Sequence, residues 1–255
     1  MISSILSQEE AARMKTRYQE VADLLVSKGK CVALTGAGIS AESGIPTFRS
    51  KGGLWEKYDP MVYASAEVFR QDPSKYWLIR GDFIRNYNHY EPNPGHIALA
   101  RLEQMQILRH VITQNIDGLH KKAGSINVTE IHGSLREIYC LSCRKEYLAP
   151  DVPEGQPPYC ECGGVLKPNT VLFGEQLPPA ALETAYHESS TCNVMLVIGT
   201  SAVVQPAASL PYLAQQNGAV VVEINLENAF PGANIHIEGK AGTVVPKIVE
   251  ALTSG

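Results

Sequence analysis

Apolar residues recur along the chain at two spacings, which predict alternating helices and buried strands. Between Ala11 and Leu25 they recur at steps of three and four, which predicts an amphipathic helix that ends at Gly29. Ser7, with Glu10 three residues later, is the expected start of this helix, because the pair forms a capping-box pattern. Short apolar runs bounded by turn residues predict buried strands at residues 31–35, 110–113, 194–198 and 219–224.

Helical patterns lie between these runs, at residues 95–105, 179–188 and 206–216. Buried strands that alternate with helices are typical of a parallel sheet covered on both faces. The expected fold class is therefore α/β, with a doubly wound, Rossmann-like parallel sheet.

Two segments interrupt this alternation. Residues 48–94 are rich in aromatic side chains, and residues 133–168 hold four cysteines and many prolines. We expect both to be insertions that together form a smaller module beside the sheet. The main domain would then consist of residues 1–47, 95–132 and 169–255.

Composition and charge exclude some classes of function. The chain has 255 residues, a net charge of −4 and a pI near 6.0, which argues against direct nucleic-acid binding because no excess of Lys and Arg is available for phosphates. No apolar stretch approaches the roughly 20 residues that span a bilayer, and Met1 to Gln8 lack a secretory signal pattern. We therefore expect a cytoplasmic protein without membrane partners.

Four of the six cysteines form two close pairs, Cys140-x-x-Cys143 and Cys160-x-Cys162. Two such pairs are typical of a zinc ribbon, in which thiolates hold zinc tetrahedrally. Four cysteine ligands saturate the metal, so the zinc is expected to be structural, and residues 133–168 to be a structural zinc module. The second pair has one intervening residue where two are commoner, which tightens the chelate.

The first predicted strand leads directly into Gly36-Ala37-Gly38. Glycines in such a turn let backbone N–H groups approach a pyrophosphate at the positive end of a following helix. A glycine-rich turn after a strand is about as often only a tight connection, so this segment by itself leaves nucleotide binding open.

Small and polar residues also follow three later strands: Gln114, Asn115, Asp117, Gly199, Thr200, Ser201 and Asn225. The carboxyl ends of parallel strands meet at one edge, where open α/β sheets bind their ligands. His132, in the segment Ile131-His132-Gly133-Ser134, precedes the cysteine region. Taken alone, the polar segments are also consistent with helix-capping turns, and the histidine with a surface or core residue.

Taken together, these segments resemble the signatures of the sirtuin family, in the family's order and spacing. They are residues 36–49, 113–117 and 131–134, the two cysteine pairs, and residues 171–175, 199–201 and 223–225. The resemblance extends over about residues 18 to 250. It implies an NAD-dependent protein-lysine deacylase whose substrates are acylated-lysine proteins or peptides.

The resemblance implies a cofactor site built from Gly36, Ala37, Gly38, Phe48, Arg49, Trp55, Gln114, Ile116, Gly199, Thr200, Ser201, Asn225 and Ala241. The glycine turn and Ser201 would line the phosphates, and Asn225 the adenine ribose. Phe48 and Arg49, on a mobile loop, would cover the nicotinamide ribose and exclude water. Residues 48–94 would thus form a cofactor-loop and helical insertion.

For catalysis, the resemblance assigns His132, Asn115 and Asp117. Asn115 and Asp117 would hold the nicotinamide end, Asp117 through the carboxamide, and Gln114 would reach the nicotinamide ribose. His132 would be the general base that takes a ribose hydroxyl proton after nicotinamide leaves. An imidazole suits this role because its ordinary pKa lies near neutral pH.

The resemblance also implies a substrate site that contains Ala64, Arg80, Phe83, Val171, Phe173, Gly174 and Glu175. The peptide would add as a strand along Phe173-Gly174-Glu175. Sirtuins that remove acidic acyl groups carry a Tyr and an Arg three residues apart on the pocket floor, and those positions fall on Arg80 and Phe83. Because Phe83 cannot pair with a carboxylate, we expect acetyl or another neutral acyl group.

Several alternatives differ in class. A zinc-dependent dehydrogenase needs an open metal position, which four cysteines deny. A non-catalytic NAD-binding module has no need of His132 with Asn115 and Asp117. An ADP-ribosyltransferase or NAD hydrolase would use the same cavity without an activated ribose hydroxyl. A desuccinylase remains open if the Arg80 side chain turns inward.

Overall fold

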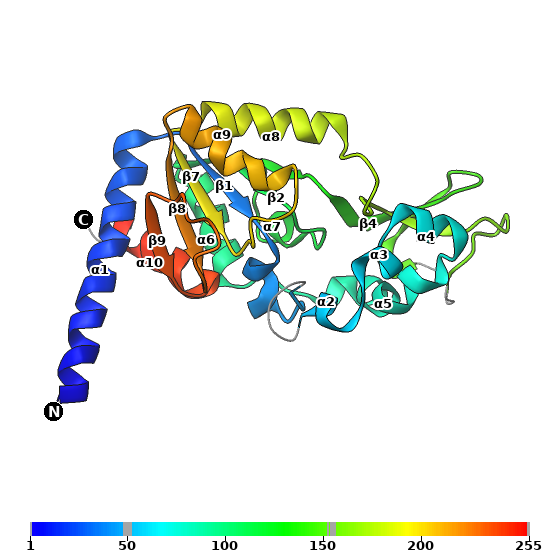
Figure 1. The fold of residues 1–255 in the computed structure, drawn as a ribbon, viewed down its shortest axis with the longest axis horizontal. Coiled ribbons are helices and arrows are strands. Elements are labelled where there is room, and N and C mark those ends of the chain that lie inside the picture. The colour runs from blue at the N-terminus through cyan, green and yellow to red at the C-terminus, as the bar shows by residue number, and fades with distance from the viewer. Residues whose placement is uncertain (1, 48–52, 152, 154–156, 254–255) are drawn as a thin grey trace.

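The structure is a computed structural model that describes residues 2–47, 53–151, 153 and 157–253. At its centre is a six-stranded parallel sheet with the strand order β3-β2-β1-β7-β8-β9 (Figure 1). The strands are β1 (Cys31–Thr35), β2 (Leu108–Thr113), β3 (Val128–Glu130), β7 (Val194–Ile198), β8 (Val220–Asn225) and β9 (Ile235–Glu238). This order is that of a dinucleotide-binding sheet. The strands after β1 are added first on one side of it, as β2 and β3, and then on the other, as β7, β8 and β9, so the strand order reverses between β1 and β7.

Helices cover both faces of the sheet, as the alternating pattern predicts. On one face α1 (Ile2–Lys28), α6 (Pro94–Gln104) and α10 (Ala241–Thr253) share a core with the sheet, and on the other α8 (Pro179–Thr191) and α9 (Leu210–Gln216) do so (Figure 1). The doubly wound α/β prediction is therefore confirmed. None of the helices in the described part of the chain is both long and apolar enough to cross a membrane.

The helix α1 begins at Ile2, so the predicted start at Ser7 is wrong. The five residues from Ile2 to Leu6 contain neither proline nor glycine, so nothing in them stops the helix from continuing past a capping-type pattern. The predicted end is confirmed, since Gly29 has φ 60° and its N–H donates to the Leu25 carbonyl.

The two insertions share one core. It contains Phe69, Tyr76 and Trp77 from the first and Leu135 and Leu166 from the second. The first carries α2 (Leu54–Lys57), α3 (Pro60–Tyr63), α4 (Ala66–Gln71) and α5 (Ser74–Arg85), and the second a sheet of order β5-β4-β6. Those strands are β4 (Gly133–Cys140), β5 (Glu146–Leu148) and β6 (Leu166–Thr170). The predicted smaller module therefore lies beside the sheet (Figure 1).

Short elements complete the chain. They are α7 (Leu119–Lys122) and the 3-10 helices η1 (Ala37–Ser43), η2 (Tyr87–His89), η3 (Ala149–Asp151) and η4 (Ala207–Ser209). The helix expected over residues 206–216 is thus a 3-10 turn followed by α9, which carries a proline in its first turn.

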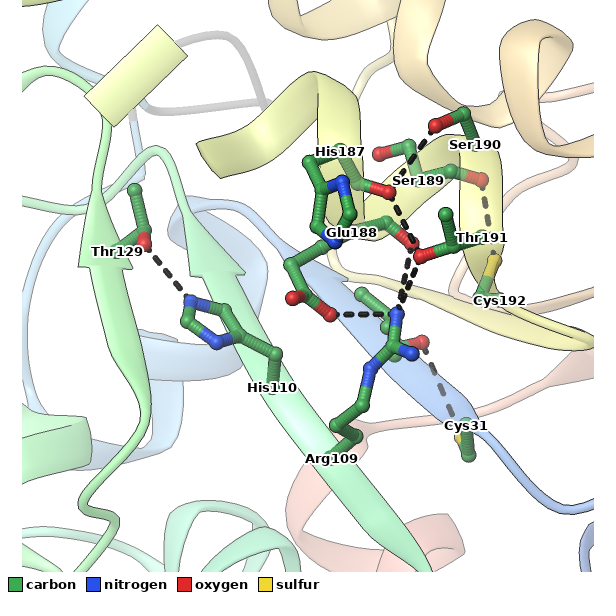
Figure 2. A network of polar contacts seen from close by, with 11 residues as sticks. Cys31, Arg109, His110, Thr129, His187, Glu188, Ser189, Ser190, Thr191 and Cys192 are labelled. Carbon is green, nitrogen blue, oxygen red and sulfur yellow. Dashed lines mark hydrogen bonds and ion pairs between the residues drawn. The ribbon is translucent and has the colours of Figure 1, made fainter. Parts of the chain in front are cut away.

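A polar network fixes the end of α8 to β2 (Figure 2). Arg109 pairs with the Glu188 carboxylate at 2.6 Å and donates to the Thr191 hydroxyl at 2.8 Å. The last turn of α8 has no basic residue of its own, so Arg109 places a cation where the helix dipole favours one. Cys31 and Cys192 are both buried close by, and each belongs to the hydrophobic core on one face of the sheet.

Candidate active site

A cavity of about 1300 Å³ opens between the parallel sheet and the smaller module. Loops after β1, β2, β7 and β8 form one side of it, and residues from α5 and the segment after β6 form the other. The cavity therefore lies at the carboxyl ends of the strands, at the point where the strand order reverses, which is where open α/β sheets bind ligands.

The cavity brings together most of the predicted cofactor residues. The lining residues include Gly36, Ala37, Gly38, Trp55, Gln114, Ile116, Gly199, Thr200, Ser201, Asn225 and Ala241. Two of the predicted cofactor residues, Phe48 and Arg49, lie outside the described residues.

The glycine turn packs tightly against the loop after β7. A Cβ on Gly36 would lie 2.8 Å from the Thr200 Cβ, and one on Gly38 would lie 2.7 Å from the Gly199 Cα. The N–H of Gly36 donates to the Ile198 carbonyl at 3.0 Å, and that of Gly38 to Gly199 at 2.8 Å. Both glycines are thus required by contact between two strand ends, and both N–H groups are used within the protein.

The turn leads into the seven-residue 3-10 helix η1, which ends at Gly44 with φ 83°. The helix that follows the glycine turn is therefore a 3-10 helix, which begins at Ala37. Asn93 holds this helix from the start of α6, because its side chain donates to the Ile39 carbonyl at 2.7 Å.

Behind the turn, Ser40, Asn115 and Asp117 form a buried hydrogen-bonded chain. The Asn115 amide donates to the Ser40 hydroxyl at 3.1 Å, and Ser40 donates to Asp117 Oδ2 at 2.7 Å. Asp117 Oδ1 accepts the N–H of Leu119 at 2.9 Å. Burial raises the pKa of Asp117, because desolvation outweighs these hydrogen bonds.

Two histidines, packed edge to face, extend this chain. His96 lies 3.3 Å from the Ser40 hydroxyl through Nε2, and its Nδ1 accepts the N–H of Asn93 at 3.4 Å. The rings of His96 and His120 are 4.9 Å apart, and His120 Nε2 lies 2.9 Å from the Thr35 hydroxyl. Burial lowers the pKa of His96 to about 4 and holds that of His120 well below its ordinary value, so both rings are neutral near pH 7.

His132 lines the cavity with Asn115 and is partly buried. Its Nδ1 lies 3.0 Å from the Gln114 carbonyl, and since a carbonyl only accepts, Nδ1 carries the hydrogen. In the neutral ring Nε2 is then the free base. Burial lowers the pKa of His132, although the bond to Gln114 opposes this, so the base form predominates at neutral pH.

The predicted substrate segment follows β6 and pairs with the other insertion. The N–H of Phe173 donates to the Ala64 carbonyl at 2.9 Å, and the N–H of Ala66 donates to the Phe173 carbonyl at 2.9 Å. The Phe173 backbone is therefore already paired on this side. Gly174, with φ 88°, and Val171 also line the cavity.

Glu175 is fixed by a buried lysine. Lys167 Nζ lies 3.2 Å from Glu175 Oε2, which also accepts the N–H of Leu172 at 2.9 Å. The ammonium donates in addition to the Thr170 carbonyl at 3.0 Å. This ion pair joins β6 to the last residue of the substrate segment and so fixes the loop between them.

On the opposite wall, Ala64, Tyr76 and Arg80 line the cavity and Phe83 does not. The Tyr76 hydroxyl lies 3.2 Å from that of Thr170. Desolvation lowers the pKa of Arg80, and neighbouring Tyr76 opposes this. Phe83 instead packs against Tyr90 at 4.8 Å, one helical turn past Arg80.

The four cysteines of the two pairs come together in the smaller module. Their sulfur atoms all lie within 4.8 Å of one another, with Cys140 and Cys162 at 3.5 Å and Cys143 and Cys160 at 3.6 Å. A tetrahedral ion with Zn–S bonds of 2.3 Å needs sulfurs about 3.8 Å apart. The residues thus fit zinc, and the short second pair is accommodated. Four cysteine ligands would leave no open position for water on such an ion, so it would be structural.

Comparison with known proteins agrees with this architecture. The model of the Sir2 family matches residues 36–206, more than half of the chain. The chain belongs to the Sir2 family. The assignment made from the sequence motifs is therefore confirmed, and the protein is a sirtuin.

Relatives of this sirtuin carry names that fit its site. It is 50% identical over 236 residues to an "NAD-dependent protein deacylase 2" of Pyrobaculum aerophilum, covering 90% of this chain and 94% of the relative. A solved structure of a Sir2 homolog–NAD complex has a TM-score of 0.84 and 43% identity, covering 92% of this chain and 93% of the other. Another, with a deacetylated p53 peptide and 3'-O-acetyl ADP ribose, has a TM-score of 0.86 and 37% identity, covering 91% and 96%.

Two of the expected site residues do not line the sirtuin's cavity among the residues described. Asp117 lies behind Asn115, and Phe83 is packed in the helical insertion. Sequence reasoning also missed residues that do. Tyr76, Val204, Gln205 and Lys240 line the cavity, and His96 supports it from behind. Of these residues, only His96 lies in a recognisable sequence pattern, because Asn93-Pro94 marks the start of a helix. That pattern predicts a helix cap and gives no indication that His96 lies behind a cavity.

Proposed function

We propose that this sirtuin is an NAD-dependent protein-lysine deacylase, which transfers an acyl group from lysine to ADP-ribose and releases nicotinamide. The observation that carries the proposal is that one cavity contains the glycine turn, the substrate segment and an imidazole with a free Nε2. The names of its relatives support the same activity.

NAD, when bound, supplies an electrophilic ribose carbon and a leaving nicotinamide. On the protein side, we infer that Gly36, Ala37, Gly38 and Ser201 line the phosphates and that Asn225 contacts the adenine ribose. Gln114 would reach the nicotinamide ribose, and Asn115 would hold the nicotinamide end. Asp117, which lies behind Asn115, would act through Ser40, whose hydroxyl orients the Asn115 amide. Phe48 and Arg49 would exclude water.

His132 would take the proton of a ribose hydroxyl at Nε2, while the Gln114 carbonyl holds Nδ1–H. This division requires a neutral ring, and the lowered pKa of His132 supports that state. The acylated lysine would enter past Val171 and Phe173, with the peptide backbone along Gly174.

We infer a corresponding division of labour along the chain. Residues 1–47, 95–132 and 169–255 would bind the cofactor, and residues 48–94 would cover it. Residues 133–168 would hold the zinc that supports the cleft. Acylated-lysine proteins or peptides are the proposed partners.

The acyl group is proposed to be acetyl or another neutral chain. The apolar lining around Ala64, Ile116 and Val171 supports this, as does the acetylated product in the related structure. A second candidate is an acidic acyl group, and the observation that favours it is that Arg80 lines the same cavity.

A panel of peptides decides between these substrates. We expect kcat/KM on acetyl- and butyryl-lysine to exceed that on succinyl-lysine. Burying the succinyl carboxylate without a cationic partner placed for it costs roughly 2 kcal/mol or more. Mass spectrometry should identify nicotinamide, free lysine and acyl-ADP-ribose. A succinyl preference that disappears in Arg80→Met would establish the acidic alternative, and nicotinamide release without peptide would indicate a hydrolase.

A further inference from the structure

Glu223 is a fully buried carboxylate in the middle of the parallel sheet. It is the fourth residue of β8, and its side chain is 0% exposed. Alternation along the strand puts it on the same face as Val221, which belongs to the core beneath α8 and α9. A charged residue at a core position costs stability unless every acceptor is satisfied, so its partners are informative.

Both oxygens of this carboxylate have partners. Oε1 accepts the N–H of Ala229 at 2.9 Å and that of Phe230 at 3.0 Å. Oε2 lies 3.0 Å from Nδ1 of His236, the residue opposite Glu223 on β9. The carboxylate therefore ties a loop to the sheet at a point where no strand pairing could do so.

That loop is a wall of the cavity. Leu226, Glu227 and Ala229 line the cavity, between the end of β8 and the buried ring of Phe230. Phe230 packs against Tyr212 of α9, with ring centroids 4.7 Å apart. The loop is thus held from the core by one ring and by two hydrogen bonds to Glu223.

Glu223 also acts on Asn225. The Asn225 amide donates to the Thr200 carbonyl at 2.8 Å and lies 3.4 Å from Glu223 Oε1. Its Oδ1 accepts the N–H of Leu226 at 3.0 Å. The Thr200 carbonyl and Glu223 Oε1 therefore fix the orientation of the Asn225 amide in the cavity.

We propose that Glu223 is a positioning residue for the adenosine end of the cofactor site, acting through Asn225 and the Leu226–Ala229 wall. This inference rests on the proposed function, because Asn225 is assigned there to the adenine ribose. The ligand that it concerns is the adenosine half of a dinucleotide, so the effect should appear in cofactor binding and not in acyl transfer.

Binding of ADP-ribose by isothermal titration calorimetry tests the proposal without turnover. Glu223→Met removes the acceptors, and the dissociation constant should rise about tenfold, the equivalent of one or two lost hydrogen bonds. Glu223→Gln keeps a carbonyl oxygen for the two N–H groups and an amide for His236, so it should bind within about threefold of wild type.

Val221→Ala is the matched control, because Val221 lies on the same strand and face but does not line the cavity. It should lower Tm and leave ADP-ribose binding unchanged. In steady state, Glu223→Met should raise KM for NAD while kcat and KM for peptide stay near wild type. Hydrogen exchange should increase in residues 226–230 of that variant alone.

Glu223→Asp serves if the Met variant does not fold, since it keeps the charge but withdraws the carboxylate by one methylene. It should weaken ADP-ribose binding in the same direction. Equal binding by wild type and by the Met or Asp variant would overturn this proposal. A wild-type protein that does not bind ADP-ribose would instead overturn the proposed function.

Discussion

The chemistry proposed for this cavity depends on one imidazole whose two nitrogens have different surroundings. His132 donates from Nδ1 to the Gln114 carbonyl, and this leaves Nε2 as the base. Burial lowers its pKa, so protonation competes less with catalysis near neutral pH. The presence of a histidine at position 132 can be recognised in the sequence. Its tautomer instead follows from the hydrogen bond to Gln114, 18 residues away.

Replacement of His132 tests its role as the base. We expect His132→Ala to lower kcat by about 10²–10⁴-fold, the usual contribution of a general base. In the pH profile of kcat/KM for the wild type, the acid limb should lie below pH 6.5. The reason is that the pKa of His132 is lowered, so its ring stays neutral as the pH falls. This limb should vanish in the variant, while Tm changes little. Nicotinamide release that needs no peptide and survives the substitution would contradict this.

At the scale of elements, β4 and β6 connect the zinc module to the chemistry. His132 immediately precedes β4, Val171 immediately follows β6, and the Val171 N–H donates to the His132 carbonyl at 2.9 Å. The other ends of these strands meet the cysteine cluster, where Cys140 is paired with Leu166. A structural ion bound at one end of this pair of strands would therefore help to order the substrate cleft at the other.

Removal of zinc should consequently affect activity indirectly. We expect one zinc per chain, and its removal by a chelator should unfold the module, since such binding is worth on the order of 10 kcal/mol of folding energy. Limited proteolysis should then cut within residues 133–168 first, and deacylation should be lost.

Cys143→Ala should lose the metal, whereas Cys192→Ala, a buried cysteine outside the cluster, should retain it. Metal analysis by mass spectrometry distinguishes the two variants. A metal-free protein that stays folded and active would show that the cluster has another role.

At the scale of the whole molecule, a buried polar network lies behind the cavity. His96, Ser40 and Asp117 link α6, η1 and the loop after β2 by hydrogen bonds. The histidines of this network are neutral when folded, because burial lowers the pKa of His96 to about 4. In an unfolded chain the same ring titrates near 6.5.

Stability should therefore fall in acid. The folded pKa is the lower one, so the unfolded state binds the proton first, and stability is complete above pH 6.5 and declines from 6.5 towards 4. The loss from His96 is on the order of 3 kcal/mol. Asp117, whose pKa is raised, acts in the opposite direction.

Denaturant unfolding at pH 7.5, 6 and 5 measures this dependence. A shallower decline is expected for His96→Gln, whose amide has no charge to gain, and an unchanged decline for His89→Gln, since His89 is exposed. Equal slopes for wild type and His96→Gln would show that the buried histidine is not the cause.

Local patterns predicted the elements and the family, because the spacing of apolar residues and the turn residues between them can be recognised within a few positions of the chain. The apolar runs 31–35 and 194–198 are strands with those bounds, and the cysteine spacing indicated the zinc cluster. The start of α1 was misplaced because a capping-box pattern permits a helix start without enforcing one. The hydrogen bond that Asn93 donates to Ile39, in the 3-10 helix after the glycine turn, joins residues 54 positions apart and has no local signal.

The sequence by itself therefore determined the α/β fold class. It also indicated the four cysteines proposed as zinc ligands and the histidine proposed as the base, since these signals lie in short runs of neighbouring residues. Only the tertiary structure decided which nitrogen of His132 is free, why Gly36 and Gly38 tolerate no side chain, and that Arg80 rather than Phe83 lines the cavity. These features arise where segments distant in sequence meet at the carboxyl ends of the strands, and contact, desolvation and hydrogen bonding there are properties of the assembled fold.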